Sequence, residues 1–358
     1  MRKTCTFTPN LIFVFILLAR TLSAQTYGLL DLSSLLGGST VAHKVNLSGH
    51  VASTSGARDG GSGRAAIWTG NKGQLSSLGA LKGGDYSEAN GINNRDDVVG
   101  SSNTDVNVRA VLWSNRQSKD LGALPGDTAS RAFGINDQLQ IVGYSSGPSG
   151  VRAFLWTPKM GMTPLPLLRG TKSSEACGIN NRGQVVGILK TRQGDHGFMW
   201  APDKGLVELG NLPGDQTNRA MGINDSGEVV GSSAGPSGTR AYIWTLTKGI
   251  TALPDVPRLG FSEALDINNR GQIVGTYETP LGNRACLWTN PAAFFDLNDL
   301  VPTGSGVVLT MALGINDQGQ IIAIGVNSPT TDANHQMDQD EADDAHGADI
   351  HAFLLNPR

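Results

Sequence analysis

Charged residues recur at equivalent places in the sequence, where they could bind or transform a ligand. Five loop-like stretches end in a residue whose sign alternates along the chain: Glu88, Arg131, Glu175, Arg219 and Glu263. Three of these stretches also carry an aspartate: Asp85, Asp127 and Asp215. Gathered around one space, such groups could bind a sugar or an anion, and a suitably spaced carboxylate pair could cleave a glycosidic bond. The same charges could instead form ion pairs that fix the packing of the elements that carry them.

A second candidate is the acidic stretch 326–350. Carboxylate oxygens suit Ca²⁺ or another divalent cation, and the candidate ligands are Asp338, Asp340, Glu341, Asp343 and Asp344. The spacing is not that of an EF-hand, because the D-x-[DN]-x-[DN]-G run and its terminal glutamate are missing. The composition predicts a solvated, flexible loop, with a cation site as the alternative.

Signatures of several enzyme and nucleic-acid-binding classes are missing. There is no H-E-x-x-H metal motif, no phosphate-binding glycine loop and no S-x-D-x-G-x-x-W Asp-box. The formal net charge is −3, and the stretch 326–350 holds much of the acid, so no basic patch is left for a nucleic acid. We therefore predict no nucleic-acid partner, no catalytic residue and no cofactor other than the possible Ca²⁺.

The segments that must position the charged residues belong to a repeat. GINNRGQVVG at 178–187 returns in close copies, and its first asparagine marks seven units: Asn46, Asn93, Asn136, Asn180, Asn224, Asn268 and Asn316. The intervals are 43 to 48 residues. Each unit contains four short strand-like runs separated by turn residues, without the 3.6-residue period of a helix. Units of this size and content are typical of propeller blades.

Counting equivalent strands predicts how the ring closes. Runs of the fourth type begin before the first repeat, near Leu32, whereas the chain ends on a run of the third type, near Leu355. The run 27–36 can therefore complete the blade that 309–355 begins, which leaves no open sheet edge. All six tryptophans end a third run, which indicates packing between blades. We predict an all-β, seven-bladed propeller of four-stranded antiparallel blades, closed by pairing the N-terminal strand with the C-terminal blade.

The third run carries a resemblance to a known family. RAFLW at 152–156 and HAFL at 351–354, together with the G-I-N-x-x-G-x-V-V-G segment, resemble the HAF repeat family of extracellular bacterial proteins. The resemblance covers nearly all of the chain after residue 24 and implies export and a propeller-like repeat, but no activity. The order of turn and strands is also similar to that of WD40 repeats, which implies that the G-I-N run is the innermost strand.

The first 24 residues resemble a secretory signal peptide. Arg2 and Lys3 precede an apolar run at 11–19 that is too short for a stable membrane anchor, and cleavage is expected after Ala24. The propeller then spans 25–358, with the acidic loop inserted in its last blade. We expect an exported protein, extracellular or periplasmic, that is not inserted in a membrane after cleavage.

These inferences favour a secreted, non-enzymatic propeller that binds an extracellular glycan or protein through the loops leading into the inner strands. One alternative is a hydrolase or lyase that acts on a polysaccharide through channel carboxylates. This alternative gains if the carboxylates face an open cleft without basic partners, and loses if each is matched by an arginine. The other alternative is a structural protein of the cell envelope or matrix.

Overall fold

One repeat unit shows why this sequence forms a small sheet. In residues 173–208 four strands pair in chain order: β14 (Ser173–Ile179), β15 (Val185–Lys190), β16 (Asp195–Ala201) and β17 (Gly205–Glu208). The β14–β15 hairpin closes at Gly183, whose φ of 71° favours glycine. A Cβ at Gly187 would lie 2.0 Å from the carbonyl oxygen of Glu175, so only glycine lets β15 pass so close to β14.

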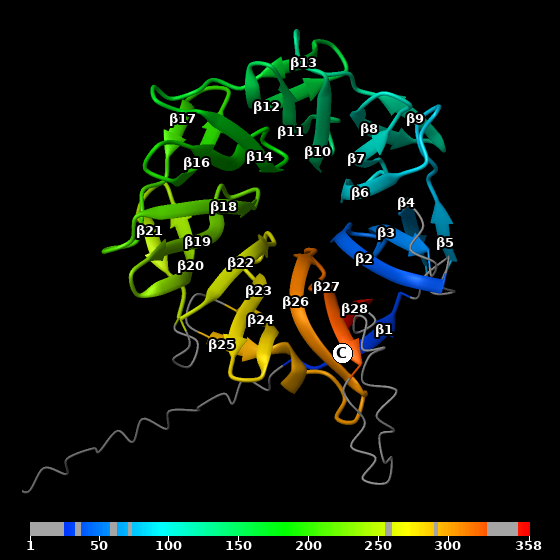
Figure 1. Cartoon of the computed structure of the whole chain (residues 1–358). Helices are drawn as coiled ribbons and strands as arrows, with labels where there is room; N and C mark the ends of the chain where they lie inside the picture. Colours follow the sequence, from blue (N-terminus) through cyan, green and yellow to red (C-terminus); the bar gives the residue numbers. More distant parts are fainter. Residues whose placement is uncertain are drawn as a thin grey trace, which may run out of the picture.

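The computed structural model contains seven such four-stranded antiparallel sheets arranged in a ring (Figure 1). The structure describes residues 25–32, 37–57, 63–70, 74–254, 260–289, 293–327 and 350–358. We number the sheets as blades 1 to 7 in chain order, so that the unit above is blade 4. The predicted fold class is confirmed. Within the described residues, the single helical segment is a 3-10 turn at Leu297–Asp299, and no helix is long and apolar enough to cross a membrane.

The other blades repeat the same strand order. Blade 1 contains β2 (Gly37–Val45), β3 (Val51–Ala57), β4 (Arg64–Thr69) and β5 (Gln74–Ser77); blade 2 contains β6 (Ser87–Ile92), β7 (Val98–Asn103), β8 (Val108–Ser114) and β9 (Gln117–Asp120); blade 3 contains β10 (Ala129–Ile135), β11 (Ile141–Gly147), β12 (Gly150–Thr157) and β13 (Gly161–Pro164). Blade 5 contains β18 (Thr217–Ile223), β19 (Val229–Gly235), β20 (Gly238–Thr245) and β21 (Gly249–Ala252); blade 6 contains β22 (Ser262–Ile267), β23 (Ile273–Thr279), β24 (Gly282–Thr289) and β25 (Ala293–Asp296).

Blade 7 joins the two ends of the described chain. It contains β26 (Val307–Ile315), β27 (Ile321–Asn327), β28 (Ile350–Pro357) and, as its outer strand, β1 (Tyr27–Asp31). β1 runs antiparallel to β28, with Tyr27 opposite Pro357 and Asp31 opposite Phe353. The predicted closure of the ring is therefore confirmed, and Figure 1 shows β1 beside β28.

The hydrophobic core lies between neighbouring sheets. One buried cluster combines Val142 and Leu155 of blade 3 with Val185 and Phe198 of blade 4, and comparable clusters occupy the other six interfaces, including the one between blades 7 and 1. Trp288, at the end of the third strand of blade 6, is fully buried in such a cluster, as the tryptophan pattern predicted. Each blade therefore depends on its neighbours for burial of apolar surface.

The strand directions define two faces of the ring. The first-to-second-strand turns, such as Asn180–Gly183, lie on one face, which we call the turn face. The loops that lead into the first strands lie on the opposite face, which we call the loop face.

Two predicted segments lie outside the described residues: the signal peptide 1–24 and the acidic carboxylates Asp338, Asp340, Glu341, Asp343 and Asp344.

Candidate functional site on the channel axis

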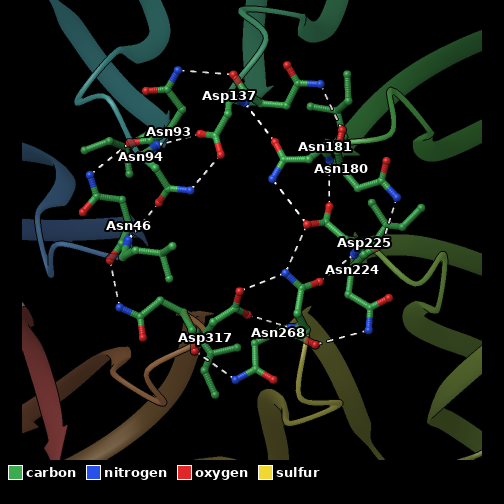
Figure 2. A pocket seen from close by; sticks show the side chains of 18 of the residues that line it. Asn46, Asn93, Asn94, Asp137, Asn180, Asn181, Asn224, Asp225, Asn268 and Asp317 are labelled. Carbon is green, nitrogen blue, oxygen red and sulfur yellow. Dashed lines mark hydrogen bonds between the residues drawn. The ribbon is translucent and has the colours of Figure 1, made fainter.

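A hollow of about 170 Å³ opens on the ring axis at the turn face, and we call it the axial pocket. Each of the seven blades contributes three consecutive residues to it: an aliphatic residue, an asparagine and the residue that follows. In blade 4 these are Ile179, Asn180 and Asn181. The pocket is thus built from the ends of the innermost strands and the turns that follow them (Figure 2).

The repeated asparagines form a closed ring of hydrogen bonds around the axis. The side-chain Nδ2 of Asn180 donates to the backbone oxygen of Asn224 in the next blade at 2.8 Å, and Asn316 donates in the same way to Asn46 at 2.8 Å, which joins blade 7 to blade 1. The other five blade-to-blade steps make the same bond at 2.9 to 3.2 Å. We call these seven residues the asparagine ring.

Each asparagine also fixes its own turn. The Oδ1 of Asn180 accepts the backbone N–H groups of Arg182 and Gln184, both at 3.0 Å, and its Nδ2 donates to Gln184 Oε1 at 2.8 Å. The asparagines of the ring are only 3% to 6% exposed. Because one side chain holds the turn and links it to the next blade, the asparagine recurs in every unit for structural reasons.

The residue after each ring asparagine surrounds the mouth of the axial pocket, and together they form what we call the rim: Leu47, Asn94, Asp137, Asn181, Asp225, Asn269 and Asp317. Each rim residue before Asp317 donates its backbone N–H to the side-chain oxygen of the next one. Asn181 donates to Asp225 Oδ1 at 2.8 Å, and Asp225 donates to Asn269 Oδ1 at 2.7 Å. The chain of bonds stops between Asp317 and Leu47, because the leucine side chain has no acceptor.

The rim carries three negative charges at blades 3, 5 and 7. Asp137, Asp225 and Asp317 are half-buried and stand around the open centre in Figure 2. Throughout the described part of the chain, no lysine, arginine or histidine lies within ion-pair distance of these carboxylates. Nor do the described residues bring three or more His, Cys, Asp or Glu side chains close enough to hold a metal ion. The axial pocket is therefore an anionic, polar hollow.

A second hollow of about 150 Å³ lies further along the channel and contains one ion pair. Lys44 Nζ of blade 1 lies 2.6 Å from Asp266 Oδ1 of blade 6, and Asp266 Oδ2 accepts the backbone N–H of Ile315 at 2.9 Å. The equivalent position in the other five blades is glycine. Blade 7 lies between blades 6 and 1, and its equivalent residue is Gly314. A Cβ added to Gly314 would lie only 3.4 Å from the Cα of Lys44, so this glycine leaves room for the ion pair to connect blades 1 and 6 past blade 7.

At the loop face, the predicted alternation of charge forms one ion pair between neighbouring first strands. Glu88 of β6 pairs with Arg131 of β10, and Tyr86 Oη donates to Glu88 Oε2 at 2.8 Å. Burial opposes ionisation of Glu88, but the bonds from Tyr86 and Ser101 and the charge of Arg131 together lower the pKa of its carboxyl. Burial and the bond to Glu88 raise the pKa of Tyr86 to about 12.

The remaining first-strand charges find other partners. Glu175 Oε1 lies 2.7 Å from Lys190 Nζ of its own blade, and Arg219 Nε lies 3.4 Å from Asp195 Oδ2 of the preceding blade. Glu263 accepts a hydrogen bond from Ser232 of the preceding blade at 3.0 Å. The five alternating charges therefore do not form one continuous ring of glutamate–arginine pairs.

The loop aspartates are also engaged. Asp127 Oδ1 lies 2.9 Å from Arg152 Nη2, and Asp215 Oδ1 lies 3.0 Å from Arg240 Nη2. The two aspartate side chains are at most 2% exposed. Asp85 accepts a hydrogen bond from Asn103 Nδ2 at 2.6 Å. Arginines thus match Glu88, Asp127 and Asp215, a lysine matches Glu175, and Asp85 and Glu263 accept hydrogen bonds from Asn103 and Ser232, so the condition against the hydrolase alternative is met for part of the set.

The residues that sequence reasoning missed are the rim and the Lys44–Asp266 pair. Both were visible as departures from the repeat: asparagine and aspartate alternate after the ring asparagine, and Lys44 and Asp266 replace a glycine. The rim residues follow the marker asparagine in every unit, where asparagine and aspartate are also the usual residues of a turn, so their types alone do not reveal a pocket.

Comparison with known proteins shows the fold alone. No model of a protein family matches the sequence, and no curated protein matches it. A catalytically inactive virginiamycin B lyase from Staphylococcus aureus, solved with quinupristin, superposes with a TM-score of 0.54 at 12% identity, covering 92% of this chain and 99% of that chain. The β-propeller domain of the Trilobed protease from Pyrococcus furiosus gives a TM-score of 0.53 at 10% identity, covering 88% and 93%. YCF48 bound to D1 peptide gives 0.53 at 9% identity, covering 93% and 96%. The chain is therefore a β-propeller, and these identities carry no function to it.

Proposed function

We propose that this protein is an exported, non-enzymatic propeller of the HAF repeat type that binds an extracellular glycan or protein partner, and that the axial pocket is its binding site. The observation that carries the proposal is the pocket itself: a polar hollow on the axis, lined by every blade, with three carboxylates that lack a basic partner among the described residues. Polar groups that converge on a concave site are the usual mark of a ligand-binding position.

Export is supported by the sequence. The basic residues Arg2 and Lys3, the apolar run at 11–19 and the resemblance of RAFLW and HAFL to the HAF repeats all favour it.

The loop face is the second candidate surface of the same function. Its residues Asp85, Glu88, Asp127, Arg131, Glu175, Asp215, Arg219 and Glu263 were the ones predicted from sequence. We favour the axial pocket because the basic partners at the loop face have largely neutralised the carboxylates there.

A glycan array tests the proposal, with residues 25–358 applied in calcium and again in EDTA. Three proteins are compared: the native chain, a rim variant with Asp137, Asp225 and Asp317 changed to asparagine, and a loop-face variant with Glu175→Gln and Glu263→Gln. We expect saturable binding to one sugar class, lost in the rim variant and kept in the loop-face variant. Loss in the loop-face variant alone would move the site to the loop face. Loss in EDTA would show that binding needs a divalent cation, for which Asp338, Asp340, Glu341, Asp343 and Asp344 are the predicted ligands.

A blank array is followed by affinity capture of extracellular proteins from the producing cell, with the rim variant as the control. A partner held by the native chain and not by the rim variant supports the proposal. Self-association without any saturable ligand would contradict it and favour the structural alternative.

A further inference from the structure

The second hollow of the channel, which we call the inner hollow, is lined by two kinds of surface. Its volume is about 150 Å³. Blades 2 to 5 contribute large apolar side chains to its wall: Ile92, Ile135, Ile179, Ile223, Phe133 and Met221. Blades 1 and 6 contribute the ion pair of Lys44 and Asp266. The inner hollow thus combines an apolar wall with two opposite charges that lie 2.6 Å apart.

The blades do not need this ion pair in order to pack. The equivalent residue of the other five blades is glycine, which suits the close approach of neighbouring first strands. A Cβ at Gly178 would lie 3.3 Å from the carbonyl oxygen of Met221 in the next blade. Lys44 and Asp266 are the two departures from glycine, and they contact each other at the wall of a hollow. Because replacing a buried ion pair by uncharged residues is often neutral or stabilising, the pair points to a role in binding.

The hydrogen-bonding capacity of the pair selects the polar part of a ligand. Both oxygens of Asp266 already have a partner, since Oδ1 lies 2.6 Å from Lys44 Nζ and Oδ2 accepts the N–H of Ile315 at 2.9 Å. An ammonium group has three donors, and Asp266 is the one partner of the Lys44 ammonium in the part of the chain that the structure describes. Lys44 is 35% exposed and lines the inner hollow. Its other donors can therefore be accepted by a hydroxyl or carbonyl oxygen in the hollow.

The charge balance of the inner hollow selects an uncharged ligand. Lys44 and Asp266 already neutralise each other. A ligand with a charge of either sign would remain without a counter-charge beside apolar side chains, which is costly. A neutral oxygen acceptor does not have this cost.

The volume of the inner hollow selects the size of the apolar part. An engineered cavity of about 150 Å³ lined by leucine, isoleucine and phenylalanine binds benzene in another protein. The inner hollow has a similar volume, and isoleucines and Phe133 form part of its wall. One six-membered ring therefore fits it.

We infer that the inner hollow binds a small uncharged molecule that consists of one apolar ring with a hydroxyl or carbonyl group. The oxygen of this group accepts a hydrogen bond from Lys44, and the ring packs against Phe133 and the isoleucines. This is a second binding site, and it does not depend on the proposed function of the axial pocket.

NMR of residues 25–358 with labelled isoleucine methyl groups tests the inference with four probes of similar size: benzyl alcohol, toluene, benzoate and benzylammonium. We expect benzyl alcohol to bind best. Toluene has no acceptor for Lys44 and the two ions bring an unpaired charge, so each should bind at least about tenfold more weakly.

The isoleucine methyl signals also locate the bound probe. Four isoleucines line both hollows, whereas Ile267 and Ile315 line the axial pocket and not the inner hollow. We expect benzyl alcohol to shift the methyl signals of the four shared isoleucines more than those of Ile267 and Ile315.

Two variants test the two parts of the site. Met221→Phe fills the hollow with a residue that blade 3 has at the equivalent position, and it should bind benzyl alcohol at least about tenfold more weakly because two rings compete for one volume. Met160→Phe is the matched control, because Met160 is 61% exposed and lies outside the hollow. In K44G/D266G the preference for benzyl alcohol over toluene should disappear. Circular dichroism checks the fold of each variant.

Three results would overturn the inference: equal affinity for the four probes, no binding of any probe, or methyl shifts confined to Ile267 and Ile315. A preference for benzyl alcohol that persists in K44G/D266G would also contradict it, and this test remains if Met221→Phe does not fold. None of these results affects the proposed function, which the rim variant tests with the array ligand or captured partner.

Discussion

The two ends of the channel hold the ring together in different ways. At the turn face, the same contact is made at all seven blade-to-blade interfaces: the side-chain Nδ2 of an asparagine donates to the backbone oxygen of the asparagine in the next blade. At the loop face, equivalent charges find different partners, as Glu88 pairs with the next blade and Glu175 with its own. We therefore expect the contact that every blade repeats to stabilise the ring as a whole, and each contact that is particular to one blade to be lost without affecting the remaining blades.

Three substitutions test this difference. They are described in order of the expected loss in the free energy of unfolding, from the largest to the smallest.

The largest effect is expected from Asn180→Ala in the asparagine ring. The change removes two donated and two accepted hydrogen bonds of a buried side chain. At about 1 kcal/mol for each bond, the free energy of unfolding should fall by roughly 3 to 5 kcal/mol. Urea denaturation measures the change.

The neighbouring Asn181→Ala is the control, because this residue is exposed on the rim. We expect a loss of about 1 kcal/mol or less. Equal losses for the two variants would show that the repeated contact has no special structural role.

A smaller effect is expected from Lys44→Met, which leaves Asp266 in the channel without its cation. The Asp266 side chain is 11% exposed and Lys44 is 35% exposed. We expect a loss of about 2 kcal/mol in the free energy of unfolding, below that of a fully buried pair. The double variant K44G/D266G restores the glycine of the other blades and should be more stable than Lys44→Met alone.

Denaturant unfolding of the native chain, K44G, D266G and K44G/D266G forms the double-mutant cycle that isolates the coupling between the two residues. Lys204→Met, at an exposed turn lysine, controls for loss of charge. Additive effects would mean that the pair does not strap blades 6 and 1 together.

The smallest effect is expected at the loop face, from Glu88→Gln. The pKa of Glu88 is lowered in the folded protein, so its ionised form stabilises the fold above the ordinary glutamate pKa of about 4.3, and the contribution is lost as the pH falls through the lowered value. At pH 7 we expect the variant to be less stable by about 1 kcal/mol, since the pair is partly exposed.

Unfolding of both proteins at pH 7 and at pH 3 provides the measurement. The difference between native chain and variant should shrink at the lower pH. A difference that grows at pH 3 would contradict the direction of the pKa shift.

The fold could be predicted from the sequence because every blade of the propeller carries the same sequence pattern. Seven marker asparagines, Leu32 before the first unit and Leu355 after the last were enough to predict that β1 completes the last blade. The position of the G-I-N run on the innermost strand was also expected, from the resemblance to WD40 repeats.

The candidate site could be predicted only in part, because its contacts cross between blades. The alternating signs predicted neighbouring pairs, and only Glu88 and Arg131 form one between first strands; Lys190 and Asp195, on the second and third strands of blade 4, lie closer to Glu175 and Arg219. The rim depends on distances between residues about 44 positions apart. Such distances depend on the radius of the ring, and the repeat period of the sequence does not determine that radius.

The pairing of β1 with β28 sets the order in which the molecule can assemble. The last blade has no outer strand until residues 27–31 meet residues 353–357. Closing so long a loop is the entropically expensive step of folding, so we expect it to be late and slow. Until it happens, the edge of β28 is free to pair with another chain. A nick that releases residues 25–32 from the folded protein would expose the edge of β28 again, so we expect the nicked protein to self-associate more readily than the intact one.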